Sequence, residues 1–402
     1  MDGLGLVKEK SYTFCQPPHE LILESGQKLG PITLVYENYG RLNEDRSNAI
    51  LVFHTLSGDA HAAGRRSPDD QKPGWWDGLI GPGKGLDTDR FFVICANTIG
   101  GCKGSTGPGS IDPKTGRPYG ARFPVITIRD MIAAQKRLID HLGIRTLYAT
   151  IGGSMAGMEV LDWAVTYPDA VLHSIPIATA AYQPAQNIAF HEAGRRAILK
   201  DPNWNNGDYY DGKAPADGLS VARMIGHITY LSDETLKRKF GRKLQDKSDF
   251  DYRLDVEFEV EGYLNYKGES FTKRFDANSY LYITRAIDYF DLAKRYGALA
   301  DAFRNVKSSF HLISFSSDWL YPTSKLEEIE EALRVNDKAV THRIIESSYG
   351  HDAFLVESDK LGNVVKQYFE NSKQIQFVEN SVRSRKHMPQ HEEKPLTTTP
   401  IV

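Results

Sequence analysis

Three short segments carry residues that could together perform nucleophilic catalysis. The stretch "IGGSMAGM", residues 151–158, places Ser154 among small residues between an apolar run and a helical pattern. A G-x-S-x-[GA] turn of this kind joins a strand sharply to a helix and exposes the serine hydroxyl at the helix N-terminus. Because Gly-rich turns also occur without chemistry, the assignment depends on finding a base and a carboxylate for the serine.

Two later segments supply these partners in the chain order Ser, Asp, His that the turn architecture requires. Asp318 in "SFSSDWLYP" follows the apolar run 310–315, and His351 in "SSYGHDAFL" follows the apolar run 342–347. Both lie at the carboxyl ends of predicted strands, where α/β sheets assemble their sites. The sequence therefore predicts a catalytic triad of Ser154, His351 and Asp318.

A serine that attacks a carbonyl carbon also needs hydrogen-bond donors for the oxyanion. The backbone N–H of Met155, at the start of the helix after the serine, is one candidate. The loop "FHTLSGDAHAAG", residues 53–64, is expected to supply the second, and we favour the N–H of Leu56.

Strand-like and helical segments alternate around these motifs. Continuous apolar runs at 49–54 and 90–97 are typical of parallel strands buried on both faces. Residues 127–130 form a capping-box pattern at the start of a helix that ends near Gly143. This alternation predicts the α/β class, with a mostly parallel central sheet flanked by helices.

The alternation is interrupted by a long, mostly helical segment. We expect residues 1–181 and 301–380 to form the α/β core, and residues 182–300 to be a helical lid inserted into it. The polar tail, residues 381–402, is expected to be disordered.

One predicted lid helix, "GLSVARMIGHITYLS", separates two kinds of side chain. Arg223, His227 and Tyr230 share one face, while apolar residues such as Val221 and Ile228 occupy the other. The polar face could be solvated, or Arg223 could reach a carboxylate in a pocket beneath the lid.

Composition narrows the function classes. A chain of 402 residues with 41% hydrophobic and 25% charged residues is typical of soluble globular proteins, and a net charge of −3 with a pI near 6.5 argues against nucleic-acid binding as the main role. Neither a membrane-spanning run nor a signal-peptide pattern is found, so a cytoplasmic location without membrane contact is expected. Three cysteines indicate no disulfide framework, and no metal-ligand spacing is found. Cys102 lacks a histidine beside it and is interpreted as a packed residue.

Together, these segments resemble the homoserine O-acyltransferases of methionine biosynthesis, a family with the α/β-hydrolase fold. The similarity covers roughly residues 15–370 and includes "HTLSGDAHAAG", "NTIGGCKGSTGP", "GGSMAGMEVLDWA", "GLSVARMIGHITYLS", "RFDANSYLYITRAIDYFDL" and "GHDAFL". It implies an acyl-CoA donor, an amino-acid alcohol as acceptor, a lid over a deep tunnel, a homodimer and no permanently bound cofactor.

The resemblance also assigns roles to residues. It makes Ser154 the nucleophile with Asp318 and His351 as partners, and it makes Leu56 and Met155 the oxyanion amides. Arg223 and Asp352 are implied to hold the amino-acid substrate, because a guanidinium matches a carboxylate and a carboxylate holds an ammonium group. Tyr230, on the face of Arg223, is also predicted to bind substrate. These assignments list eight residues: Leu56, Ser154, Met155, Arg223, Tyr230, Asp318, His351 and Asp352.

One position departs from the family pattern. Ala156 stands where the family usually has Gly, which adds a methyl group to the turn that carries the nucleophile. This methyl group bears on turnover and substrate choice more than on the triad.

The substrate pair is expected to be acetyl-CoA as co-substrate and L-homoserine. The alternatives are a succinyl donor, for which Arg195 and Arg196 are candidate cations, and serine as acceptor. The cationic run 236–243 is a candidate site for CoA. From other classes, a lidded serine esterase and a ligand-binding protein without turnover remain alternatives.

Overall fold

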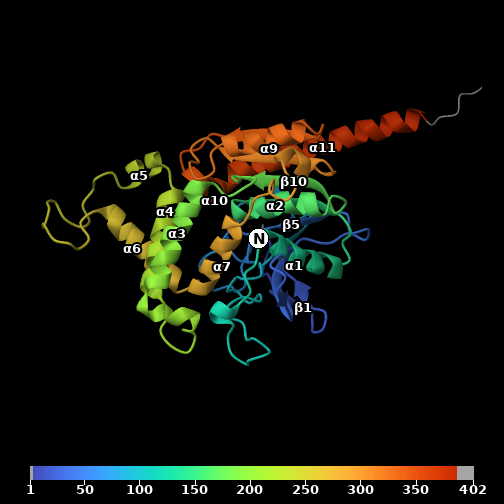
Figure 1. Cartoon of the computed structure of the whole chain (residues 1–402). Helices are drawn as coiled ribbons and strands as arrows, with labels where there is room; N and C mark the ends of the chain where they lie inside the picture. The colour runs from blue at the N-terminus through green and yellow to red at the C-terminus, as the bar shows by residue number, and fades with distance from the viewer. Residues whose placement is uncertain (1–2, 387–402) are drawn as a thin grey trace, which may run out of the picture.

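The computed structural model describes residues 3–386 and contains one eight-stranded sheet (Figure 1). β1 and β4 pair antiparallel, as do β4 and β8, and all the other neighbours in the sheet pair parallel. In spatial order the strands are β1 (Lys10–Phe14), β4 (Ile32–Tyr39), β8 (Phe92–Ala96), β5 (Ala49–Val52), β9 (Leu147–Gly153), β10 (Val171–Ile177), β11 (Ser309–Phe315) and β12 (Val340–Ile345).

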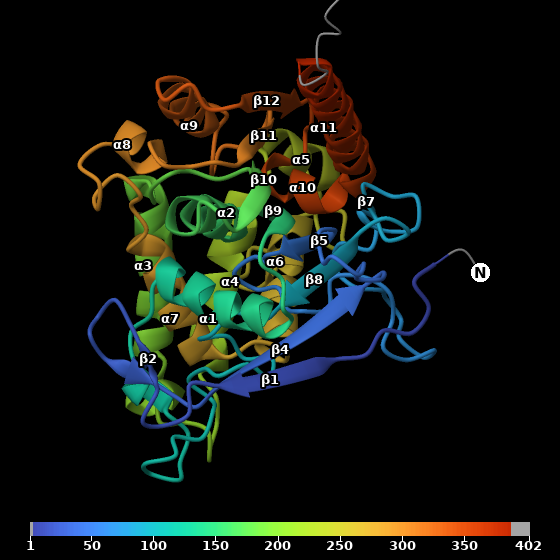
Figure 2. The ribbon, with the colours of Figure 1, turned by 90° about the vertical axis from the view of Figure 1, so that its right-hand side faces the viewer.

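Helices cover both faces of this sheet, which explains the continuous apolar strands. Leu51 of β5 belongs to the hydrophobic cluster that includes the helices α1 (Ile128–His141) and α2 (Met155–Thr166). Its neighbours Ile50 and Val52 point to the other face, toward α11 (Ser358–Lys386). Figure 2 shows α1 and α2 on one side of the sheet and α11 on the other. The predicted α/β class with a mostly parallel sheet is confirmed.

Short elements complete the core. The capping box at the start of α1 is present, with the Thr127 N–H donating to Asp130 at 2.9 Å. The core also contains the two-stranded ribbons β2–β3 (Leu21–Ile22, Lys28–Leu29) and β6–β7 (Ile80–Gly81, Leu86–Asp87), and the helices α8 (Leu299–Phe303), α9 (Ser324–Arg334) and α10 (Ala353–Val356).

The chain between β10 and β11 is helical and lies to one side of the core (Figure 1). We call residues 182–300 the lid, and its boundaries remain a prediction. Within it, α4 packs against both α3 and α6. The lid helices are α3 (Ala185–Lys200), α4 (Ala216–Tyr230), α5 (Asp233–Lys239), α6 (Glu259–Thr272) and α7 (Ala277–Asp288).

The orientation of α4 decides between the two interpretations of its polar face. His227 is only 5% exposed and Arg223 is partly buried, whereas Val221 and Ile228 are 44% and 45% exposed. The polar face therefore lies against the core, and part of the apolar face lies outside.

The C-terminal segment differs from the expectation at its start. Helix α11 continues to Lys386, so residues 381–386 are helical in place of the expected disorder. The sequence before Pro389 holds neither Gly nor Pro after residue 363, so nothing in it ends the helix earlier. The rest of the tail, 387–402, lies outside the described residues. Across residues 3–386, no helix is both long and apolar enough to cross a membrane.

Two buried histidines lie where α11 covers the sheet. The His173 Nδ1 and the Tyr368 hydroxyl are 3.0 Å apart, and the His311 ring stacks on the Tyr368 ring with a centroid distance of 4.4 Å. Burial lowers the pKa of both His173 and His311 to about 4, because desolvation disfavours the imidazolium form.

We expect the free energy of unfolding to fall as the pH decreases from about 6.5 to about 4. In this window the unfolded chain binds protons at these histidines and the folded chain does not, so folding becomes less favourable as protons are added. Each histidine contributes up to about 1.4 kcal/mol per pH unit. Urea unfolding followed by circular dichroism at several pH values measures this slope.

The matched variants are His173→Asn with His311→Asn, and His19→Asn at an exposed position. The double variant should show a shallower pH slope, and the His19 variant should behave like the wild type. An unchanged slope in the double variant would contradict the assignment.

Candidate active site

The turn between β9 and α2 holds Ser154 in a strained conformation. Its φ of 64° and ψ of −126° are unfavourable for a residue with a side chain, and such strain is found mainly at functional sites. The turn is closely surrounded, because a Cβ at Gly153 would lie 2.7 Å from the ring of Phe354. Glycine is therefore required before the serine, and Ser154 itself lines a cavity.

The methyl group of Ala156 fits inside this turn. Ala156 is fully buried, and a Cβ added at Gly152 would lie 2.6 Å from its methyl carbon. An alanine would not fit at position 157, since its Cβ would lie 2.6 Å from the Cβ of Thr179. The Thr179 hydroxyl donates to the carbonyl of Ser154 at 2.8 Å. The alanine is accommodated because its facing residue is glycine.

The structure brings Asp318 and His351 together at the carboxyl ends of β11 and β12. The His351 Nδ1–H donates to Asp318 Oδ2 at 2.8 Å, and both side chains are at least 96% buried. Asp318 Oδ1 accepts the N–H groups of Leu320 and Tyr321, each at 2.9 Å. This pairing leaves His351 Nε2 as the acceptor that a serine proton requires.

Ser154 and His351 line the same cavity. Among the described residues, the Ser154 hydroxyl forms no hydrogen bond with His351. Catalytic hydrogen bonds are often long before substrate binds. The position of Ser154 and His351 on one cavity is therefore compatible with their acting together.

Two backbone amides beside Ser154 are available to an oxyanion. Within residues 3–386, neither the Leu56 N–H nor the Met155 N–H donates to a protein acceptor. Leu56 is the second residue of a turn closed by a 3.0 Å hydrogen bond from the Gly58 N–H to the Thr55 carbonyl, and it lines the cavity. Met155 is the first residue of α2.

The outer part of the cavity holds the predicted substrate-binding residues. Arg223, Tyr230 and Asp352 line it together. The Arg223 guanidinium lies 4.6 Å from the centroid of Phe271, and its Nη1 donates to the Ser57 hydroxyl at 3.4 Å. In the described part of the chain no carboxylate lies within 4 Å of Arg223, so its charge is available to a ligand.

The electrostatics of the outer part are dominated by positive charge. Burial, together with nearby cations, lowers the pKa of His227 to about 3, so this imidazole is neutral. Burial and then Arg223 lower the pKa of Lys267, which also lines the cavity. Burial raises the pKa of Asp352, an effect that a bound ammonium group would oppose.

Sequence reasoning missed Lys267. It lies on α6 in "LNYKGES", a stretch without a motif, and only the packing of α6 against α4 brings it to the cavity. The run 236–243 was predicted as a CoA site. From this run, Lys239 acts on Lys267 and Asp352 through its charge.

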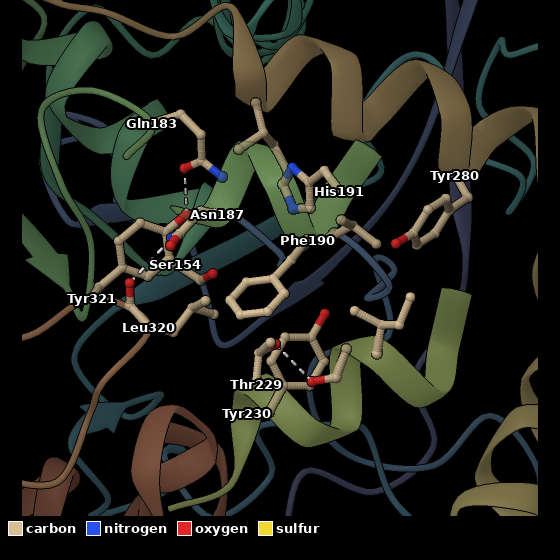
Figure 3. A pocket seen from close by; sticks show the side chains of 14 residues that line it. Ser154, Gln183, Asn187, Phe190, His191, Thr229, Tyr230, Tyr280, Leu320 and Tyr321 are labelled. Carbon is tan, nitrogen blue, oxygen red and sulfur yellow. Dashed lines mark hydrogen bonds between the residues drawn. The ribbon is translucent and has the colours of Figure 1, made fainter. Parts of the chain in front are cut away.

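A second pocket shares Leu56, Ser154 and Tyr230 with the first, and we call it the inner part of the cavity (Figure 3). The Tyr321 hydroxyl donates to Gln183 Oε1 at 2.7 Å, and Asn187 Nδ2 donates to the Leu320 carbonyl at 3.1 Å. None of the fourteen lining residues is Lys or Arg.

The two arginines considered for a succinyl group lie elsewhere. Arg195 is 3% exposed and pairs with Asp288 at 2.7 Å, while Arg196 is exposed and pairs with Glu192 at 2.7 Å. Neither lines the inner cavity.

The surroundings of Cys102 do not favour a catalytic thiol. Burial raises the pKa of the Cys102 thiol, which disfavours the reactive thiolate. Across residues 3–386, no cluster of three or more His, Cys, Asp or Glu side chains could hold a metal ion.

Comparisons with known proteins agree with this architecture. Residues 48–358 match the alpha/beta hydrolase fold family. A homoserine O-acetyltransferase of Methanohalobium evestigatum is 59% identical over 370 residues, which cover 92% of this chain and 75% of the relative. That of Solidesulfovibrio magneticus is 51% identical over 373 residues, covering 92% of this chain and 94% of the relative.

Solved structures give two kinds of neighbour. Homoserine O-acetyltransferase from Bacillus anthracis is 31% identical with a TM-score of 0.85, covering 90% of this chain and 97% of that one. Esterase E22 is also 31% identical, with a TM-score of 0.83, covering 90% of this chain and 100% of that one. The sequence identities, sustained over nine tenths of the chain, place the protein in the homoserine O-acetyltransferase family of the alpha/beta hydrolase fold.

Proposed function

We propose that this protein transfers the acetyl group of acetyl-CoA to the side-chain hydroxyl of L-homoserine, a step of methionine biosynthesis. The observation that carries the proposal is the identity of 51–59% to homoserine O-acetyltransferases over 92% of the chain. The buried Asp318–His351 pair beside a strained serine supports an acyl-serine route. A cytoplasmic location belongs to the same proposal.

In the first half-reaction, Ser154 attacks the thioester carbon of acetyl-CoA. His351 Nε2 takes the hydroxyl proton while Asp318 stabilises the imidazolium, and the Leu56 and Met155 N–H groups hold the oxyanion. The bond from carbon to sulfur breaks, CoA leaves with the proton, and an acetyl-serine remains.

In the second half-reaction, homoserine replaces CoA. His351 takes the proton of the homoserine hydroxyl, whose oxygen attacks the acetyl carbon. The bond to the Ser154 oxygen breaks, the serine regains its proton, and O-acetylhomoserine leaves.

The outer part of the cavity suits an amino acid. Within residues 3–386 Arg223 pairs with no carboxylate, so it can hold the substrate carboxylate, and Asp352 can hold the α-ammonium group. Tyr230 packs beside Arg223, with the guanidinium 5.7 Å from its ring centroid. The positive charges of Arg223, Lys239 and Lys267 also favour an anionic CoA ester.

The donor is assigned from the inner part of the cavity. A succinyl group would place a carboxylate there, and a buried carboxylate needs a cation. The lining holds no Lys or Arg, and its one histidine, His191, lies with Nδ1 2.7 Å from Asp288, the carboxylate that also pairs with Arg195. These observations favour an acetyl group.

The competing function is ester hydrolysis, supported by the structural likeness to esterase E22. Both reactions form an acyl-serine and differ only in the second nucleophile. Arg223 and Asp352 give a transferase the means to hold an amino-acid alcohol, and a general esterase has no need of them.

The deciding experiment measures intact-protein mass after mixing with acetyl-CoA, followed by a chase with homoserine, serine or buffer. We expect an acetyl adduct that homoserine removes much faster than water does. Equal removal by buffer alone would identify a hydrolase, and a preference for serine or for succinyl-CoA would change the substrate pair.

Two variants serve as controls. Ser154→Ala should form no adduct and lower kcat by about 10⁶, as in other serine-triad enzymes. Asp318→Asn should lower kcat by about 10⁴, because the histidine loses its correct tautomer. Near-normal activity in either variant would contradict the triad.

A second prediction concerns Arg223 and Asp352. Arg223→Lys keeps the charge but loses the two-pronged geometry, so we expect the KM for homoserine to rise about 10-fold or more. Asp352→Asn should raise the same KM, whereas the rate of acetylation by acetyl-CoA should change less. A selective loss of acetylation in Asp352→Asn would contradict its role in acceptor binding.

We also infer a homodimer formed through the lid. Apolar side chains remain exposed on its helices, with Val221 44%, Ile228 45% and Tyr266 67% exposed. These side chains on α4 and α6 would be buried by a second copy of the chain.

Light scattering after gel filtration tests this inference. We expect a dimer for the wild type, a monomer for Ile228→Asp, and a dimer for Ile344→Asp. Ile344, on β12, is also 45% exposed and therefore a matched control. A monomeric wild type at micromolar concentration would contradict the inference.

A further inference from the structure

One buried histidine outside the proposed triad contacts the turn that contains Leu56. His54 follows β5 and is only 4% exposed. Both of its ring nitrogens lie within hydrogen-bond distance of the backbone, Nε2 at 3.0 Å from the Thr98 N and Nδ1 at 2.8 Å from the Thr55 O. It is not among the residues that line the cavity.

These two contacts define the protonation of the ring. The Thr98 N–H is a donor, so Nε2 must be the acceptor, and in a neutral imidazole the hydrogen then lies on Nδ1. Nδ1–H therefore donates to the Thr55 carbonyl. Burial lowers the pKa of His54, which keeps the ring neutral and this arrangement intact.

The Thr55 carbonyl and the Leu56 N–H belong to one peptide group. In a trans peptide these two bonds point in opposite directions, so a donor that holds the carbonyl also sets the direction of the N–H. The same carbonyl accepts the Gly58 N–H at 3.0 Å. A Cβ at Gly58 would lie 3.0 Å from the Cβ of His54, so the turn packs directly on this histidine.

We propose that His54 is a positioning residue that aims the Leu56 N–H at the oxyanion, by holding the Thr55 carbonyl through Nδ1–H. This inference rests on the proposed acyl-serine chemistry. In this proposal His54 acts through the peptide group and not by contact with the substrate.

Two substitutions separate the two nitrogens. His54→Asn places an amide N–H donor near the position of Nδ1 and removes the acceptor for Thr98. His54→Gln places an acceptor near the position of Nε2 and removes the donor to Thr55. The first variant keeps the proposed positioning contact, and the second keeps only the contact with Thr98.

The measurement is the rate constant of Ser154 acetylation in a single turnover, with acetyl-CoA and with p-nitrophenyl acetate as acyl donors. Complete loss of an oxyanion donor costs about 10²–10³ in rate, and we expect a mis-aimed donor in His54→Gln to cost about 10–10². His54→Asn should stay within about 3-fold of the wild type. Deacetylation by homoserine should slow in parallel, because the oxyanion forms in both steps, while the KM for homoserine stays unchanged.

Thermal unfolding of the same variants distinguishes positioning from stability. If His54 only stabilised the fold, the variant with the lower melting temperature would also be the one with the slower acetylation. Acetylation as fast in His54→Gln as in the wild type, or equal losses in both variants, would overturn the inference. Failure of the wild type to acetylate Ser154 with either donor would overturn the proposed function itself, whereas acetylation by the ester alone would still test His54.

Discussion

The rest of the site depends on the sharp backbone turn at Ser154. A serine at φ 64° is unfavourable on its own, and it persists because the surrounding structure holds it. The Ser154 N–H donates to the Ile177 carbonyl at 2.9 Å, and the Ser154 carbonyl accepts the Thr179 hydroxyl. The ring of Phe354 closes against Gly153 from the segment that follows His351. The turn and the histidine loop are thus packed together, so the geometry of one constrains the other.

The cavity at this turn has two chemically different parts. Its inner part is lined without Lys or Arg, and its outer part lies among Arg223, Lys267 and Asp352. A small uncharged acyl group suits the part without Lys or Arg, and the charged groups of an amino acid or of CoA suit the other. Both parts include Ser154, Leu56 and Tyr230, so the reacting carbon would lie at their junction. The different lining residues on the two parts of the cavity therefore give a physical basis for choosing both donor and acceptor.

The lid contributes to the site through the polar face of α4. In α4 the polar face lies toward the core and part of the apolar face is exposed. Two lid arginines also contact Ser57, which follows Leu56 in the same turn. Arg223 donates to its hydroxyl, and Arg274 donates to its carbonyl at 3.1 Å. Lid and oxyanion turn are therefore in direct contact.

The sequence by itself determined the sheet class and the positions of the turn, the carboxylate and the histidine. These follow from local rules, since strand ends, glycines and chain order are read along the chain. Chain order predicts that Asp318 and His351 are partners, and in the structure Asp318 Oδ2 lies 2.8 Å from His351 Nδ1. The tertiary structure alone decided which face of α4 lies inward, that Lys267 joins the cavity and that Arg195 is paired with Asp288. Helical periodicity separates two faces but does not say which one a distant segment will cover, because that depends on packing between elements far apart in the chain.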